Sequence, residues 1–171
     1  MIDITHGGVC MKELLIVGGV ILVLVLVVVS IYNGLVRARN LVKEAFSAMD
    51  VSMKKRYDLI PNLVETVKGY ASHEKETLDA VITARNKAVS AGTPEGQFEA
   101  EGELNQVMNR LFALSENYPD LKANTNFLDL QEQVRLIETE IAQSRRYYNG
   151  TARDYNNRTE TFPSLIVANM F

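Results

Sequence analysis

The longest apolar stretch of the chain extends from Leu14 to Tyr32 and contains no charged residue. As a helix, it would be about 28 Å long, close to the hydrocarbon thickness of a bilayer. A buried core helix is rarely apolar over so long a run, and the core of a cleaved signal peptide is usually shorter. The pattern predicts a retained transmembrane helix over residues 14–33 after an N-terminal tail over residues 1–13. Met11 resembles a natural start, which would leave residues 1–10 without a role.

Apolar residues recur at every seventh position between Leu35 and Val67, in two interleaved rows that form one stripe on a helix. Pro61 lies inside this stretch and lacks the N–H that a helix interior requires. Two interpretations follow. Asp58 caps a new helix that has Pro61 in its first turn and extends to about Ala91, or a single helix continues with a kink.

Two further helices are predicted by their end signals. In the segment 92–95, glycine ends one helix, Thr93 caps the next and Pro94 takes its first position. This third helix is expected to stop before Pro119, with a loop over residues 119–125. Asn126, with Asp129 three residues later, resembles a capping box. The fourth helix repeats apolar or aromatic residues at every seventh position until Pro163: Phe127, Val134, Ile141, Tyr148, Tyr155 and Phe162.

Short connections between four amphipathic helices favour antiparallel neighbours. The sequence predicts an all-α protein, in which an N-terminal transmembrane helix is followed by an antiparallel up-and-down four-helix bundle over residues 34–162. An apolar C-terminal tail over residues 163–171 follows. With four helices the tail returns toward the membrane. If Pro61 only kinks one helix, the count becomes three and the tail points away.

Charges beside the apolar run predict its orientation. Arg37, Arg39 and Lys43 follow the run within about three turns, whereas Lys12 on the other side is offset by Glu13. Because basic residues favour the cytoplasmic side, the C-terminal domain is expected in the cytoplasm of a single-pass cell-membrane protein. The same three membrane-flanking residues could contact anionic headgroups.

The composition of the chain and its lack of catalytic motifs argue against most binding and catalytic functions. The net charge of −3 argues against a nucleic-acid partner. A lone Cys10 permits neither an intrachain disulfide nor a cysteine zinc cluster, and His6 and His73 are too few for a histidine metal site. The sequence has no glycine-rich phosphate loop and no nucleophile elbow. We therefore expect no catalytic residue, no metal and no cofactor.

Several polar residues form a candidate cluster: Tyr57, Asp58, Asn62, Arg146, Asn149, Arg153, Tyr155 and Asn156. One interpretation is a pocket that binds a ligand or peptide. The favoured interpretation is structural, because buried tyrosine hydroxyls need hydrogen-bond partners that asparagine and arginine can supply. The basic segment Lys54-Lys55-Arg56 is expected to be a solvated turn.

Several motifs are similar to those of one protein family: IYNGLV at residues 31–36, RYDLIPNLVETVKGYA at 56–71, YPDLKAN at 118–124, RYYN at 146–149, DYN at 154–156 and FPS at 162–164. The chain resembles the LemA family over nearly everything from Met11 onward. The resemblance implies a bacterial single-pass membrane protein with a four-helix bundle and without an established enzymatic activity. Phe46 stands where members often have tryptophan, and members usually continue beyond Phe162 with an aromatic-rich stretch.

Two functions remain. The favoured one is a non-enzymatic scaffold on the bilayer that recruits protein partners or associates with itself. The alternative is a ligand-sensing, ion-sensing or catalytic bundle with a polar core site.

Overall fold

The structure is a computed structural model that describes the backbone of residues 5–170 and the side chains of residues 12–170. Over these residues it contains helices and no strands: α1 (Thr5–Lys68), α2 (Lys75–Ser90), α3 (Pro94–Ser115), α4 (Pro119–Lys122), α5 (Thr125–Glu160) and α6 (Ser164–Ala168). The predicted all-α class is confirmed. Residues 1–4 of the predicted N-terminal tail lie outside the described residues, and the rest of that tail belongs to α1.

The chain divides into two compact units. The bundle unit comprises Phe46–Arg146, and the apolar-helix unit comprises Met1–Ala45 together with Tyr147–Phe171. Helices α1 and α5 each contribute residues to both units.

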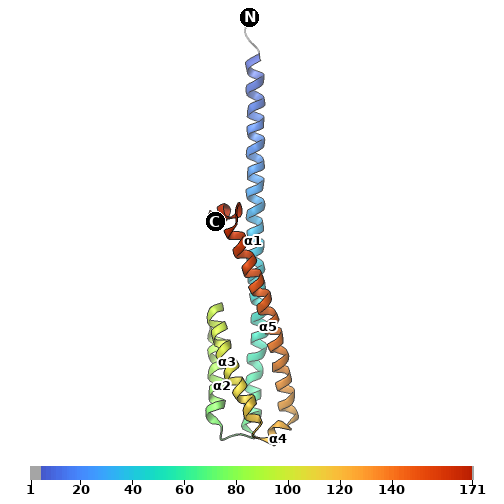
Figure 1. Cartoon of the computed structure of the whole chain (residues 1–171), viewed down its shortest axis with the longest axis vertical. Helices are drawn as coiled ribbons and strands as arrows, with labels where there is room; N and C mark the ends of the chain where they lie inside the picture. The colour runs from blue at the N-terminus through green and yellow to red at the C-terminus, as the bar shows by residue number, and fades with distance from the viewer. Residues whose placement is uncertain (1–4, 171) are drawn as a thin grey trace. The chain divides into compact units, whose positions relative to one another are not determined.

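The bundle unit consists of the second part of α1, then α2, α3 and the first part of α5, which run alternately down and up in Figure 1. These helices share one hydrophobic core, because each turns its apolar stripe toward the others. Buried apolar side chains come from every one of them and from α4, among them Met49, Met53, Ile60, Leu63, Val67, Val81, Leu104, Met108, Leu111, Leu121, Phe127 and Val134.

Pro61 does not begin a new helix. Helix α1 continues through it to Lys68, so the predicted cap at Asp58 is wrong and one helix passes through the proline, as the alternative expected. Nevertheless, the bundle unit has four main helical segments, because the chain turns between Gly69 and Glu74, where a continuous helix was expected. His73 and Glu74 therefore lie in this turn, and α2 begins at Lys75.

The proline is accommodated by a side chain from the neighbouring helix. In a regular helix the residue at position 61 would donate its N–H to the carbonyl oxygen of Tyr57. Pro61 cannot, and instead Arg85 of α2 donates from Nε to that oxygen at 3.2 Å. The carbonyl group that the proline leaves without a helical donor is thus satisfied from outside the helix.

The predicted start of α3 is confirmed, and that of α5 is shifted. Thr93 accepts a hydrogen bond from the backbone N–H of Gly96 at 3.1 Å, and Pro94 is the first residue of α3. Before α5, the cap is Asn124 rather than Asn126, because Asn124 Oδ1 accepts the N–H of Phe127 at 2.9 Å. The segment expected as a loop contains the short helix α4.

The apolar-helix unit contains the part of α1 predicted to cross a membrane. Every described side chain from Lys12 to Ser30 is exposed. Among the described residues, α1 is the helix long and apolar enough to span a bilayer. The end of α5 and all of α6 lie against α1 just after this run, where Tyr32 and Leu35 line a cleft together with Leu165 and Val167. The C-terminal tail therefore returns to the end of the apolar run.

We expect Asn124→Ala to lower the free energy of unfolding by about 1 kcal/mol or somewhat more, because it removes the cap of α5. It also removes a hydrogen bond of 2.9 Å from Asn124 Nδ2 to the Tyr70 hydroxyl. Denaturant unfolding of the full chain in detergent, followed by circular dichroism, measures the change. The exposed Asn126 is the matched control, and a larger loss for Asn126→Ala would contradict the cap assignment.

Candidate functional site: a buried polar cluster in the bundle unit

A buried arginine lies at the centre of the bundle unit. Arg56 is only 1% exposed, so its predicted place in a solvated turn is wrong, although Lys54 and Lys55 are exposed as expected. The helical period explains the difference. Arg56 follows Met53 by three residues and precedes Ile60 by four, which puts it on the same stripe as these core residues.

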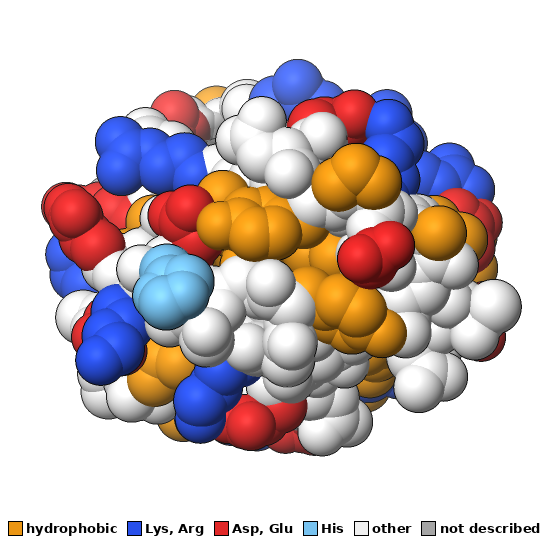
Figure 2. Space-filling model, turned by 90° about the horizontal axis from the view of Figure 1, so that it is seen from below, with side chains coloured by type: hydrophobic (Ala, Val, Ile, Leu, Met, Phe, Trp, Pro, Cys, Tyr) orange, Lys and Arg blue, Asp and Glu red, His pale blue; other side chains and the backbone are white. Residues whose placement is uncertain are grey.

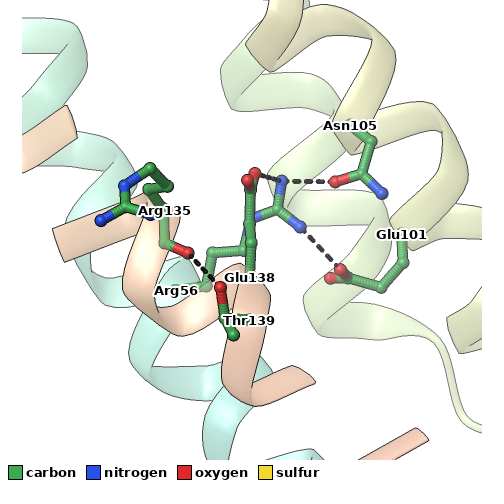
Figure 3. A network of polar contacts seen from close by, with 6 residues as sticks. All are labelled: Arg56, Glu101, Asn105, Arg135, Glu138 and Thr139. Carbon is green, nitrogen blue, oxygen red and sulfur yellow. Dashed lines mark hydrogen bonds and ion pairs between the residues drawn. The ribbon is translucent and has the colours of Figure 1, made fainter. Parts of the chain in front are cut away.

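The guanidinium of Arg56 joins three helices (Figure 3). Its Nη1 donates to Glu101 Oε2 of α3 at 2.9 Å, and its Nη2 donates to Asn105 Oδ1 at 2.6 Å and to Glu138 Oε1 of α5 at 3.2 Å. Glu101 is buried, whereas Glu138 is partly open to solvent. These contacts tie α1, α3 and α5 together through one planar cation.

The cluster is not fully hydrogen-bonded. Among the described residues, Arg56 Nε and Glu101 Oε1 are buried without a hydrogen-bond partner. One guanidinium faces two carboxylates, so the cluster carries a formal charge of about −1 when all three groups are ionised. Burying charges costs free energy that only good pairing offsets, and removing one partner leaves the other uncompensated.

A cleft of about 420 Å³ opens beside this cluster, lined by Asp50, Lys54, Tyr57, Asp58, Arg85, Val89, Ala91 and Gln97. Asp50 is held in place by Lys54 Nζ at 2.8 Å from Oδ2 and by Gln97 Nε2 at 3.0 Å from Oδ1. The hydrogen bond from Lys54 lowers the pKa of Asp50, against the opposing effect of burial. The carboxylate therefore stays ionised in the folded protein at neutral pH.

Two residues that line this cleft, Tyr57 and Gln97, contain polar atoms without a hydrogen-bond partner among the described residues. Both side chains are buried, and within the described part of the chain Tyr57 Oη and Gln97 Oε1 have no hydrogen-bond partner. Burial raises the pKa of Tyr57, and the nearby Glu101 carboxylate raises it further. The phenol is thus kept neutral over the physiological range.

The eight residues of the predicted polar cluster fall in two parts of the chain. Tyr57 and Asp58 line the cleft just described, and Asn62 and Arg146 are exposed positions of the same unit. The other four belong to the apolar-helix unit, where Tyr155 lines the cleft near α6: Asn149, Arg153, Tyr155 and Asn156. That the eight act as one binding or structural site stays a prediction.

Sequence reasoning missed the residues that contact Arg56 and Tyr57 from α3. Gln97, Glu101 and Asn105 are polar residues of the predicted third helix, and nothing in their local pattern sets them apart. Only Arg56 carried a signal, since it is a charged residue at a core position of the stripe. Within residues 12–170, His, Cys, Asp and Glu side chains form no group of three placed to hold a metal ion.

Arg56→Met is expected to lower the free energy of unfolding by about 3–5 kcal/mol, because it leaves Glu101 buried without its cation. The double variant Arg56→Met with Glu101→Met should recover a large part of this loss. Lys55→Met is the matched control one residue away, where Lys55 and Glu140 are 3.4 Å apart and 56% and 50% exposed. That change should cost at most about 1 kcal/mol. An equal loss at both positions would contradict the role of the buried pair.

Tyr57→Phe should leave stability at neutral pH nearly unchanged and make it less sensitive to alkali. The folded pKa of Tyr57 is raised, so the unfolded chain ionises first, and wild-type stability falls as pH rises above about 10. Unfolding measured from neutral to alkaline pH tests this. Tyr118→Phe, which removes a hydroxyl that donates to Glu74 at 3.0 Å, is the control expected to lose stability at neutral pH. A larger neutral-pH loss for Tyr57→Phe would contradict an unpartnered hydroxyl.

Two comparisons with known proteins point to the same family. The model of the LemA family matches residues 45–171. A curated protein named Protein LemA, from Metamycoplasma hominis, is 28% identical over 137 residues, which are 80% of this chain and 63% of that relative. The chain thus spans a little under two thirds of the relative's length. Because the family model matches well over half of its residues, the chain belongs to the LemA family.

Proposed function

We propose that this protein is a membrane-anchored helical scaffold that recruits or assembles proteins, including further copies of itself, at the membrane without catalysing a reaction. The observation that carries this proposal is the course of α1. One helix contains both an apolar run with no protein cover and the buried stripe of the bundle unit. An apolar helix surface of this length is stable where lipid surrounds it, because all its backbone groups are bonded within the helix.

The proposed orientation places the bundle unit in the cytoplasm. Arg37 and Arg39 follow the apolar run and are exposed on α1. Basic residues close to the end of a span are retained on the cytoplasmic side. No nucleic acid is expected as a partner, since the chain has more acidic than basic residues.

A surface at the end of the bundle unit supports a protein-binding role. Figure 2 shows hydrophobic side chains near the centre of this end, with charged side chains around them. Tyr70, directly after α1, and Leu128, in the first turn of α5, are exposed large hydrophobic residues of the bundle unit. An exposed apolar patch with a polar rim is typical of a protein–protein contact.

The anchor is tested with a charge in the middle of the run. Leu24→Arg should reduce the fraction of protein that stays in the membrane pellet after alkaline carbonate extraction, because a central arginine costs about 2.5–3.5 kcal/mol of insertion. Leu136→Arg, at an exposed apolar position of α5 in the bundle unit, is the matched control and should remain in the pellet. Release of the wild-type protein by carbonate would contradict the anchor. Digestion of the bundle unit from outside intact cells would contradict the orientation.

The scaffold role is tested separately by cross-linking in native membranes and by native mass measurement in detergent. Multimers or a complex with a defined stoichiometry are expected, and Leu128→Arg should reduce them more than Leu136→Arg. A strict monomer without a bound protein under both conditions would count against the proposal.

The cleft lined by Tyr57 and Gln97 favours a second candidate, a bundle that senses a small polar ligand or an ion. Its support is the pair of buried unsatisfied atoms, Tyr57 Oη and Gln97 Oε1. A ligand that binds only the folded state raises the melting temperature. A thermal-shift screen of metals, nucleotides and lipid headgroups separates the two candidates, and a hit that Gln97→Ala abolishes would favour sensing.

A further inference from the structure

The C-terminal segment Thr161–Met170 lies against α1 immediately beyond the apolar run. A cleft of about 380 Å³ is lined by Tyr32, Leu35 and Val36 of α1 and by Leu165 and Val167 of α6. Val167 is buried in this contact. The segment is therefore held at one defined height along α1.

The outer side chains of this segment are apolar and uncovered. Phe162 is 81% exposed, Ile166 is 55% exposed and Met170 is 66% exposed. From Thr161 to Met170 the sequence contains no charged residue. A short segment that keeps large apolar groups exposed and carries no charge is poorly suited to bulk water.

The height of the segment coincides with the membrane surface when the run crosses a bilayer. If the hydrocarbon region ends at Tyr32, Val36 lies about 6 Å farther along the helix axis. The headgroup layer on each side of the hydrocarbon core is about 5–8 Å thick. Residues of α6 that share a cleft with Tyr32 and Val36 therefore lie within the headgroup layer.

The neighbouring side chains match the same layer. Tyr32 and Tyr155 both line the cleft, and tyrosine is enriched at the boundary between lipid and water because its ring is amphipathic. Arg39 lines the cleft as well, and Arg37 is exposed two residues earlier. Their guanidinium groups suit the phosphates of lipid headgroups.

We propose that Thr161–Met170 is an interfacial membrane-binding element, which places Phe162, Ile166 and Met170 at the boundary between the headgroups and acyl chains of the bilayer that α1 crosses. The proposal rests on the membrane anchor of the proposed function. It assigns the exposed side chains to lipid rather than to a second copy, since the helix that holds them enters the bilayer within a few residues. The chain would then touch the membrane at two places.

The absence of tryptophan from the chain permits a direct test. Three single-tryptophan variants of the full chain are reconstituted in vesicles of phosphatidylethanolamine and phosphatidylglycerol: Ile166→Trp in α6, Leu24→Trp in the apolar run and Leu136→Trp in the bundle unit. Leu136 is the matched control because it is 51% exposed, close to the value for Ile166. Quenching is measured with lipids labelled near the headgroup, with lipids labelled near the acyl terminus, and with acrylamide in the aqueous phase.

The proposal expects headgroup-proximal labels to quench Ile166→Trp several-fold more strongly than Leu136→Trp, with emission shifted to shorter wavelength. Leu24→Trp should be quenched most by the deep label. If Leu24→Trp behaves as expected and Ile166→Trp is quenched only by acrylamide, the interfacial element is wrong and the anchor stands. If Ile166→Trp is shielded from both lipid labels and acrylamide, protein covers the segment and the proposal is likewise overturned. Without lipid quenching of Leu24→Trp, the anchor itself fails.

Discussion

The stripe on α1 from Met49 to Val67 is the constraint on which the bundle unit depends. The stripe consists of buried residues that recur every three or four positions along α1, and α2, α3 and α5 cover it. Arg56 occupies one of its positions, and the surrounding helices accordingly supply carboxylate and amide groups at that level. These polar contacts pair particular residues of α3 and α5 with Arg56 of α1, and removing one partner would leave a buried charge uncompensated.

Much of the helical organisation followed from the sequence, since periodic stripes and end signals act locally. Thr93 and Pro94 specify the start of α3 by themselves. The signal at Pro61 misled for a physical reason: part of the cost of a proline inside a helix is the carbonyl group that it leaves without a donor, and Arg85 supplies a donor to that group. The residues near Pro61 cannot predict this donor, because Arg85 lies in another helix.

The candidate site was less predictable for a similar reason. A lysine or arginine next to other basic residues is usually exposed to solvent. Lys54 and Lys55 follow that rule, whereas Arg56 is buried. Arg56 is the exception because its position on the helix, between Met53 and Ile60 on the buried stripe, directs it toward the core. Its partners Glu101 and Glu138 come from distant segments, and their pairing depends on the order and direction in which the helices pack. Burial of Tyr57 follows from the same packing.

The hydrogen bond from Arg85 to the carbonyl oxygen of Tyr57 links two residues that are 28 positions apart. Arg85 follows Tyr57 and Pro61 in the chain, so the carbonyl oxygen of Tyr57 lacks this donor until α2 has formed and packed beside α1. The turn at residues 69–74 brings α2 back beside α1 and so places Arg85 within reach of that oxygen. Helices α1 and α2 thus form a hairpin in which a side chain of the second helix completes the backbone bonding of the first.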